Sequence, residues 1–257
     1  MPWKPPPKNK HMQPVEILPW DSAFFGVRIG RVLLKSPTPE ELIAVVHQAG
    51  RDGIVCLYWL LDCADTASSW AATNCGFRLV DIRITFEHNL GTRAGEDPPL
   101  SGVRRYVPED LPALISLARK SHRDSRFFSD GNFAVERCEA LYEEWIRKGC
   151  QSGSEAVLVA VKDQQPVGYC VCSASQDGVG NIGLIAVDPR WRRARLGGAL
   201  VASALDHFRA AEMRVATVVT QGRNIASQRL YQKHGFVTQS IQLWYHRWTS
   251  AGTRGSA

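Results

Sequence analysis

Four arginines stand close together in one short turn of the sequence, at Arg190, Arg192, Arg193 and Arg195. The apolar run 182–187 before them predicts a buried strand. Beyond them, apolar residues recur every four positions and predict one stripe of a helix: Leu196, Leu200, Ala204 and Phe208. The first N–H groups of a helix lack acceptors within it and carry the positive end of its dipole, so this turn suits a phosphate. Taken alone, the turn fits a phosphate-rich ligand and ordinary solvated surface charges equally well.

A second group of residues follows the next predicted strand, the β-branched run 215–220. Asn224 is a good helix N-cap, and Gly235 is suited to end a helix because glycine readily adopts positive φ. The helix between them places Asn224 and Tyr231 on the same side, since their spacing amounts to about two turns. A tyrosine at this position either donates a proton to a ligand or only packs against its neighbours.

Together these two blocks resemble the GCN5-related N-acetyltransferases, the GNAT superfamily. The blocks are an R-x-x-x-x-G turn after a strand and the run N-x-x-x-x-x-L-Y-x-x-x-G-F, and the resemblance extends from Val103 onward. The family pattern of the turn is [Q/R]-x-x-G-x-[G/A]. Arg192 fills its first position and Gly197 its last, but Arg195 stands where the first glycine belongs. An arginine there can still offer its N–H to a phosphate if its φ is negative.

The resemblance implies an enzyme that transfers an acetyl group from acetyl-CoA, without a metal, by direct attack of an amine on the thioester. It implies backbone contacts to pantetheine and the thioester oxygen from a strand that splays away from its neighbour, at Ile185, Ala186 and Val187. The pyrophosphate would lie on the turn, at Arg192, Arg193, Ala194, Arg195, Leu196, Gly197 and Gly198. Asn224 would contact the cofactor arm, and Tyr231 would be the general acid. A phenol with a pKa of about 10 can pass a proton to a thiolate of about 8.5, provided that it faces the cofactor.

The acceptor side is expected in the segment 121–133, which joins two predicted helices. The stretches 18–26 and 126–133 resemble the dTDP-fucosamine (dTDP-4-amino-4,6-dideoxygalactose) N-acetyltransferases, so this second resemblance spans nearly the whole chain. It implies a nucleotide-linked amino sugar as substrate, with four binding residues: Arg126, Asp130, Asn132 and Phe133. A guanidinium at Arg126 matches phosphate oxygens, although a surface salt bridge is the slightly favoured explanation. No single general base stands out among His122, Asp124 and Asp130, and a water chain is an equal alternative.

The fold class expected is α/β (α+β), in two domains. The order of strands and helices in residues 14–90 predicts a small α/β domain. The polar, Pro/Gly-rich segment 91–102 predicts a linker. Residues 103–249 are expected to form the GNAT domain, a mixed, splayed central sheet flanked by helices. In the first domain, alternation over 77–86 predicts a strand that buries four apolar side chains: Val80, Ile82, Ile84 and Phe86.

Composition argues against a membrane protein, a secreted protein and a zinc-binding protein. The 257 residues are 44% hydrophobic and 22% charged, as in a globular protein, and no apolar run reaches the ~20 residues of a membrane helix. The start of the chain lacks the apolar core of a signal peptide, so we expect a cytoplasmic protein. Seven cysteines without a C-x-x-C pair favour reduced thiols over a zinc site.

The net charge of +6 comes without a long basic stripe, so neither nucleic acid nor a membrane is an expected partner, and a homodimer is left open. Two alternatives to a sugar-nucleotide enzyme remain. One is a GNAT enzyme acting on another amine, such as a protein N-terminus, a polyamine or an aminoglycoside. The other is a non-catalytic acyl-CoA-binding sensor.

Overall fold

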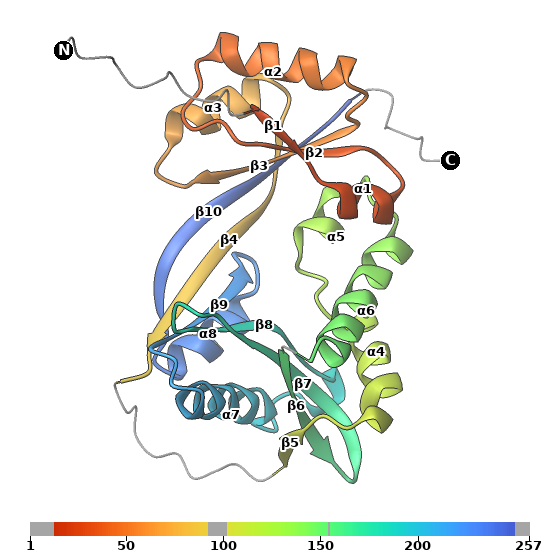
Figure 1. Cartoon of the computed structure of the whole chain (residues 1–257), viewed down its shortest axis with the longest axis vertical. Coiled ribbons are helices and arrows are strands. Elements are labelled where there is room, and N and C mark those ends of the chain that lie inside the picture. The colour runs from red at the N-terminus through yellow and green to blue at the C-terminus, as the bar shows by residue number, and fades with distance from the viewer. Residues whose placement is uncertain (1–12, 92–101, 154, 250–257) are drawn as a thin grey trace, which may run out of the picture. The chain divides into compact units, whose positions relative to one another are not determined.

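A computed structural model describes residues 13–91, 102–153 and 155–249 (Figure 1). It divides into two compact units, and each is described by itself. The first unit takes the chain up to residue 80 and again from residue 243. The second unit comprises residues 81–242. Two strands, β4 (Arg78–Asn89) and β10 (Val237–Trp248), contribute residues to both units.

The first unit is a small α/β structure. Its own strands are β1 (Val15–Ile17), β2 (Ile29–Val32) and β3 (Cys56–Asp62), and its helices are α1 (Pro19–Phe25), α2 (Pro39–Arg51) and α3 (Thr66–Asn74). Strand β2 pairs antiparallel with β1 and parallel with β3. Thr38 and Glu41 form a capping box at the start of α2, each side chain binding the other residue's N–H. The predicted alternation of strands and helices is confirmed here.

The second unit contains the helices and strands of the two chemistry-bearing blocks. In chain order they are β5 (Val103–Arg105), the 3-10 turn η1 (Pro108–Asp110), α4 (Leu111–Lys120), α5 (Arg126–Asp130), α6 (Val135–Gln151), β6 (Glu155–Lys162), β7 (Gln165–Ala174), β8 (Val179–Val187), η2 (Pro189–Trp191), α7 (Leu196–Ala210), β9 (Val215–Gln221) and α8 (Ile225–Lys233). The strand order is β10-β4-β9-β8-β7-β6-β5, and β8 pairs parallel with β9. The expected mixed sheet flanked by helices is confirmed, and the segment 121–133 contains a short helix, α5, where a loop was expected.

Strand β4 completes the sheet of the second unit. Seven of its residues, 83–89, pair antiparallel with β9 from Gln221 back to Val215. The sequence-based division assigned this strand to a first domain ending at residue 90. Because strand pairing is nonlocal, nothing in the local sequence shows which sheet a strand joins. The linker expected at 91–102 lies almost wholly outside the described residues, so the predicted domain bounds 14–90 and 103–249 stay a prediction.

The start of β4 departs from the predicted alternation. Asp81 is buried, with 5% of its surface exposed, whereas Ile82 is 38% exposed. The prediction that Ile82 points into the core was therefore wrong. The reason is the carboxylate of Asp81, which accepts hydrogen bonds in the interior, from the N–H of Ile82 at 2.8 Å and from the N–H of Arg126. A buried carboxylate is tolerated only where such donors meet it.

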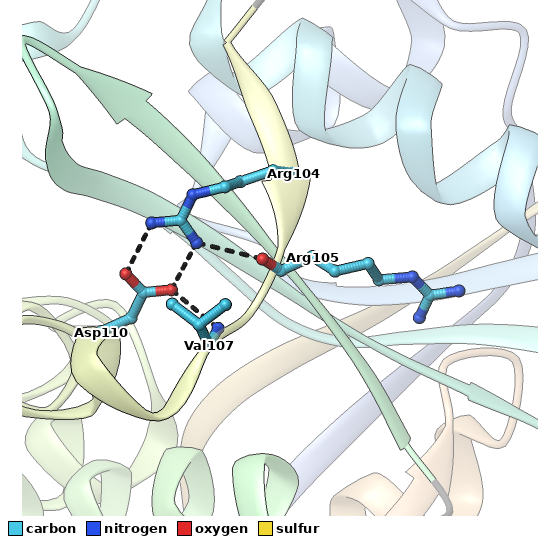
Figure 2. A network of polar contacts seen from close by, with 4 residues as sticks. All are labelled: Arg104, Arg105, Val107 and Asp110. Carbon is cyan, nitrogen blue, oxygen red and sulfur yellow. Dashed lines mark hydrogen bonds and ion pairs between the residues drawn. The ribbon is translucent and has the colours of Figure 1, made fainter.

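The connection from β5 to α4 is fixed by one ion pair (Figure 2). Arg104 donates from both terminal nitrogens to the two oxygens of Asp110, at 2.6 and 2.8 Å. Asp110 also accepts from the N–H of Val107 at 3.0 Å, while Arg104 reaches the carbonyl of Arg105. The hydrogen bond from Arg104 lowers the pKa of Asp110. The pair therefore holds the edge strand β5 against the first turn of α4.

Candidate active site

Strands β8 and β9 pair along only part of their length. The parallel pairing runs from Val179 opposite Val215 to Ile182 opposite Val218 and goes no further among the described residues. Beyond it, residues 184–187 of β8 still pair with β7, and residues 219–221 of β9 still pair with β4. The two strands therefore part after Ile182, and the splayed sheet implied by the resemblance is confirmed.

A β-bulge marks the point where the strands part. Val171 of β7 pairs with Leu184, but its neighbour Cys172 pairs with Ile182, so Gly183 is an extra residue in β8. Such a bulge bends the strand that carries it and increases its twist. The bend carries the rest of β8 away from β9.

The predicted thioester-binding residues lie just beyond this bulge. Ile185, Ala186 and Val187 pair on one side with β7, opposite Cys170, Tyr169 and Gly168. Successive residues of a strand point their N–H and C=O groups to alternate sides. Some backbone groups of this segment therefore face the gap toward β9, where a second extended chain could pair with them. Pantetheine binding at these residues stays a prediction.

Helix α7 begins directly after the arginine-rich turn. Its first intrahelical hydrogen bond runs from the N–H of Ala199 to the carbonyl of Arg195, at 3.0 Å. The N–H groups of Leu196, Gly197 and Gly198 therefore precede any acceptor within the helix. Arg190 is engaged elsewhere, because it forms a salt bridge with Asp188 at 2.8 Å. The predicted phosphate cradle thus consists of three amides with the remaining arginines around them.

Arg195 adopts a conformation normally reserved for glycine. Its φ is +59° and its ψ is 5°, which is the left-handed region, and Arg193 also has a positive φ of 67°. The condition stated from the sequence for Arg195 to offer its N–H, a negative φ, is therefore not met. The chain uses a left-handed residue to pass from η2 into α7, and the N–H groups of Leu196, Gly197 and Gly198 remain the amides at the start of the helix.

The two glycines of the turn bring α7 close to α8. A Cβ atom on Gly197 would lie 3.3 Å from Leu230 Cδ2, and one on Gly198 would lie 3.0 Å from His234 Nε2. Neither glycine has a positive φ, so space and not backbone freedom explains the residue type. The helix start predicted to bind phosphate is therefore packed directly against the helix that carries Tyr231.

Helix α8 begins at its predicted cap. The Oδ1 atom of Asn224 accepts a hydrogen bond from the N–H of Ser227 at 3.1 Å. Gly235 follows the helix with a φ of +77°, as expected of the residue that ends it. This cap accounts for one side-chain oxygen of Asn224, and the predicted contact to the cofactor arm stays a prediction.

Tyr231 lies in the interior of the second unit. It is 2% exposed, and its ring packs 6.0 Å from that of Phe86 on β4 and 5.9 Å from that of Phe236. Cys170 of β7 lies close enough to influence its ionisation. Tyr231 belongs to a core cluster that also contains residues of β4, β7, β8 and β9. Phe86, on which its ring packs, pairs with Val218, the last β9 residue before the gap.

Burial decides which proton chemistry Tyr231 can perform. Desolvation raises its pKa well above 10, and the nearby Cys170 acts in the same direction, while a hydrogen bond with Ser227 opposes both. The phenol is therefore protonated at every physiological pH and can donate a proton but cannot act as a base. A packed core tyrosine fits the same burial, so the role of general acid stays a prediction.

The four predicted acceptor-binding residues are spread over α5 and the turn after it. Arg126 opens α5, with its guanidinium 4.2 Å above the ring of Phe127. Asp130 accepts hydrogen bonds from the backbone and side-chain nitrogens of Asn132, at 3.2 and 2.7 Å. Phe133 is buried and packs edge-on against Phe127. Arg126 thus stacks on an aromatic ring, whereas Phe133 belongs to the core and the Asp130–Asn132 pair shapes a turn.

Arg223 and Asp81, which were not predicted as site residues, lie near Arg126. Arg223, in the turn between β9 and α8, hydrogen-bonds to Ser129 of α5. Asp81 lies near both Arg126 and Arg223, and burial raises its pKa to about 6 against the lowering effect of these charges. Arg223 directly precedes Asn224 in the second block, so its position was a usable signal. The signal for Asp81 was an acid among the apolar residues of a strand.

Residues 115–236 match the sequence model of the acetyltransferase (GNAT) family. This segment of the chain belongs to the GNAT superfamily. A GCN5-related N-acetyltransferase from Sphaerobacter thermophilus has the same fold, with a TM-score of 0.64 at 14% identity, over 91% of this chain and 76% of that one. Members of this family use acetyl-CoA, and the parted strands and unpaired amides described above fit that ligand.

Two curated relatives extend the similarity beyond the family segment. The dTDP-fucosamine acetyltransferase of Escherichia coli is 24% identical over 239 residues, which cover 91% of this chain and 97% of that protein. The spore coat polysaccharide biosynthesis protein SpsD of Bacillus subtilis is 28% identical over 151 residues, which cover 59% of this chain. The matched part is 52% of that relative, so the GNAT chain spans about half of its length.

Among the base candidates, His122 packs against aromatic side chains. Its Nε2 atom lies 2.8 Å from the hydroxyl of Tyr169, and its ring stacks on that of Tyr142 at 4.5 Å. Desolvation lowers its pKa to about 4, so the imidazole is neutral at physiological pH and takes up a proton only weakly. Asp124 is partly exposed on the same segment.

Metal sites and membrane-spanning helices are two other features to consider among the described residues. No group of three or more His, Cys, Asp or Glu side chains is placed there to hold a metal ion. None of the helices described is both long and apolar enough to span a bilayer. The candidate site is therefore the gap between β8 and β9, with the start of α7, Tyr231, and the charged cluster at α5.

Proposed function

We propose that this GNAT chain transfers the acetyl group of acetyl-CoA to the amino group of a nucleotide-linked amino sugar, of the dTDP-4-amino-4,6-dideoxyhexose type. The observation that carries the proposal is the similarity to dTDP-fucosamine acetyltransferase, which extends over 91% of this chain and 97% of that relative. Similarity over both lengths includes the segments outside the GNAT core, where an acceptor site differs between enzymes. The spore coat polysaccharide relative supports a carbohydrate setting.

In this proposal the donor binds along the parted strands. Backbone groups at Ile185, Ala186 and Val187 hold the pantetheine arm and the thioester oxygen. One well-placed donor to an oxygen that gains negative charge lowers the barrier by about 3 kcal/mol. The amides of Leu196, Gly197 and Gly198 take the pyrophosphate, because a helix start combines unpaired N–H groups with the positive end of the dipole. Arg192, Arg193 and Arg195 add charge to the same cradle.

Tyr231 protonates the departing sulfur in this proposal. Its pKa is raised by burial, which makes it a weaker acid than free tyrosine. A CoA thiolate leaving in the same dry surroundings is also poorly solvated, so its own pKa rises in parallel. The two groups therefore remain matched for proton transfer, and the neutral phenol can donate to the sulfur throughout the physiological range.

The acceptor approaches the thioester from the side of α5. Arg126 and Arg223 bring two guanidinium groups to this end of the sheet, and guanidinium forks match the oxygens of a diphosphate. Asp130 and Asn132 shape the turn beside them, and Phe133 supports Phe127 from below the surface. An acceptor that carries phosphates fits this basic cluster better than a polyamine or an aminoglycoside, which would require an acidic surface.

A substrate panel tests the proposal. Acetyl-CoA consumption is measured with nucleotide-linked 4-amino and 3-amino sugars, a polyamine, an aminoglycoside and a peptide with a free N-terminus. We expect turnover with a nucleotide-linked amino sugar and at least 100-fold lower kcat/KM with the other amines. Turnover confined to another amine would refute the acceptor class. Binding of acetyl-CoA by calorimetry without turnover of any amine would favour a sensor.

A further inference from the structure

Asp81 is a buried ionisable group outside the proposed chemistry. Its carboxylate accepts from its own neighbour Ile82 at 2.8 Å and from the N–H of Arg126, the first residue of α5. The charges of Arg126 and Arg223 reach it, and Tyr142 of α6 is also close enough to interact. Groups from β4, α5, α6 and the β9–α8 turn thus converge on one carboxylate.

The position of Asp81 in the sheet puts it at the acceptor end of the site. The pairing of β4 with β9 ends at Arg83 opposite Gln221, and the N–H of Gly222 then binds the carbonyl of Ile82 at 2.7 Å. Asp81 therefore lies beside the residues that leave the carboxyl end of β9. This is the end at which β9 and its parallel neighbour β8 have already parted. The hydrogen bond between Arg223 and Ser129 attaches α5 at the same place.

We propose that Asp81 accepts the proton that the acceptor ammonium must lose before it attacks the thioester. The ammonium gives one proton to the Asp81 carboxylate, and the neutral amine then forms the new C–N bond. As the C–S bond breaks, Tyr231 gives its proton to sulfur, and the second proton lost by the nitrogen passes through solvent to the Tyr231 phenolate, which restores the phenol. Asp81 finally releases its proton to solvent, so the products are the amide, the CoA thiol and one proton.

The charges around Asp81 complement the proposed substrate, so this inference rests on the proposed function. A nucleotide-linked amino sugar carries a diphosphate and an ammonium, while the cluster offers two guanidiniums and one carboxylate. A base works best when its pKa lies near the working pH. Burial brings the pKa of Asp81 to about 6, whereas that of His122 is lowered to about 4, so Asp81 is the better matched acceptor.

A purely structural role for Asp81 makes a different prediction. In that case the carboxylate only accepts the N–H groups of Ile82 and Arg126 and so positions α5. Asparagine retains a side-chain oxygen that can accept the same hydrogen bonds, but it cannot take up a proton. Asp81→Asn therefore separates the two roles. Glu87→Gln is the matched control, because it removes a partly exposed carboxylate from the same strand.

The experiment measures kcat and kcat/KM for the amine between pH 5 and 9, with acetyl-CoA binding followed by calorimetry. In the wild type and in Glu87→Gln, kcat/KM should fall as the pH drops through about 6, where Asp81 becomes protonated. Asp81→Asn should bind acetyl-CoA normally and lose about 100-fold in kcat at neutral pH, the usual size of general-base catalysis. Its rate should keep rising until the amine itself titrates, so the deficit shrinks at high pH.

The outcomes separate this inference from the proposed function. If Asp81→Asn has the wild-type kcat and the same dependence of kcat/KM on pH, Asp81 is not the proton acceptor. The proposed function is judged separately, by whether the wild type acetylates a sugar nucleotide. If the panel instead identifies another amine, the same profiles are recorded with that amine, and the role of Asp81 is judged independently. Should Asp81→Asn fail to fold, Asp81→Glu replaces it. Asp81→Glu should have a reduced kcat, but its kcat/KM should still fall at low pH. A kcat/KM that does not fall at low pH in this variant would contradict the proposal.

Discussion

Replacing Arg195 with glycine should stabilise the protein. The left-handed backbone of Arg195, with a φ of +59°, destabilises the folded state by about 1–2 kcal/mol, whereas glycine adopts it without this cost. Glycine also makes the unfolded chain more flexible, which costs roughly 0.4–1 kcal/mol. The balance predicts that Arg195→Gly raises the free energy of unfolding by ~0.5–1 kcal/mol. Urea unfolding followed by circular dichroism measures this change as a shift of the midpoint at constant slope.

Arg192→Gly is the matched control for this prediction. It removes one arginine from the same turn, but Arg192 has an ordinary extended backbone, with φ −61° and ψ 153°. Only the unfolded-state cost then applies, so Arg192→Gly should destabilise the protein by ~0.4–1 kcal/mol. Equal effects of the two substitutions would show that charge rather than backbone conformation governs the turn. A loss of stability in Arg195→Gly would refute the reasoning outright.

The remaining predictions concern proton transfer and the β5–α4 connection. Tyr231→Phe should lower kcat at least tenfold, a barrier increase of ~1.4 kcal/mol, with acetyl-CoA affinity unchanged; an unchanged turnover number would remove Tyr231 from the chemistry. Arg104→Met should cost ~1–3 kcal/mol in urea unfolding, because Asp110 is 3% exposed and loses its ion partner. The pKa of Asp110 is lowered from 3.8 in the folded state, so its stabilisation is present above that pH and is lost as the pH falls below it. Wild type and Arg104→Met should therefore converge in stability as the pH falls further below 3.8, and a constant difference would contradict this.

The parts of the site that the sequence predicts are those encoded locally. Caps and apolar spacing are properties of neighbouring residues, so α7, α8 and the cap at Asn224 were found from the sequence. The parting of β8 and β9 followed from the family resemblance, and the bulge at Gly183 supplies its physical cause. The conformation of Arg195 could not be predicted, because a non-glycine residue gives no local sign of a positive φ.

The charged cluster was missed because it is assembled by tertiary structure. Asp81 meets Arg126 and Arg223 only after β4 has joined the sheet next to β9. Alternation along β4 predicts an exposed acid at position 81, and a donor that helps to reverse this outcome, the N–H of Arg126, comes from a distant part of the chain. Burial of a polar side chain depends on partners, so a strand's own pattern cannot decide it.

The role of β4 leads to one more prediction, about the segment 103–249 on its own. This segment corresponds to the domain expected from the sequence, but it lacks the strand that pairs with all of β9. It also lacks Phe86, whose ring is 1% exposed and packs on Tyr231, and removal of such a buried ring alone costs about 3–5 kcal/mol. A typical domain is stable by only about 5–15 kcal/mol, so we expect 103–249 to show no cooperative unfolding transition, whereas a fragment that begins at residue 78 should regain part of it. A cooperative transition in 103–249, measured by urea unfolding, would show that β4 is dispensable and would support the domain boundary expected from the sequence.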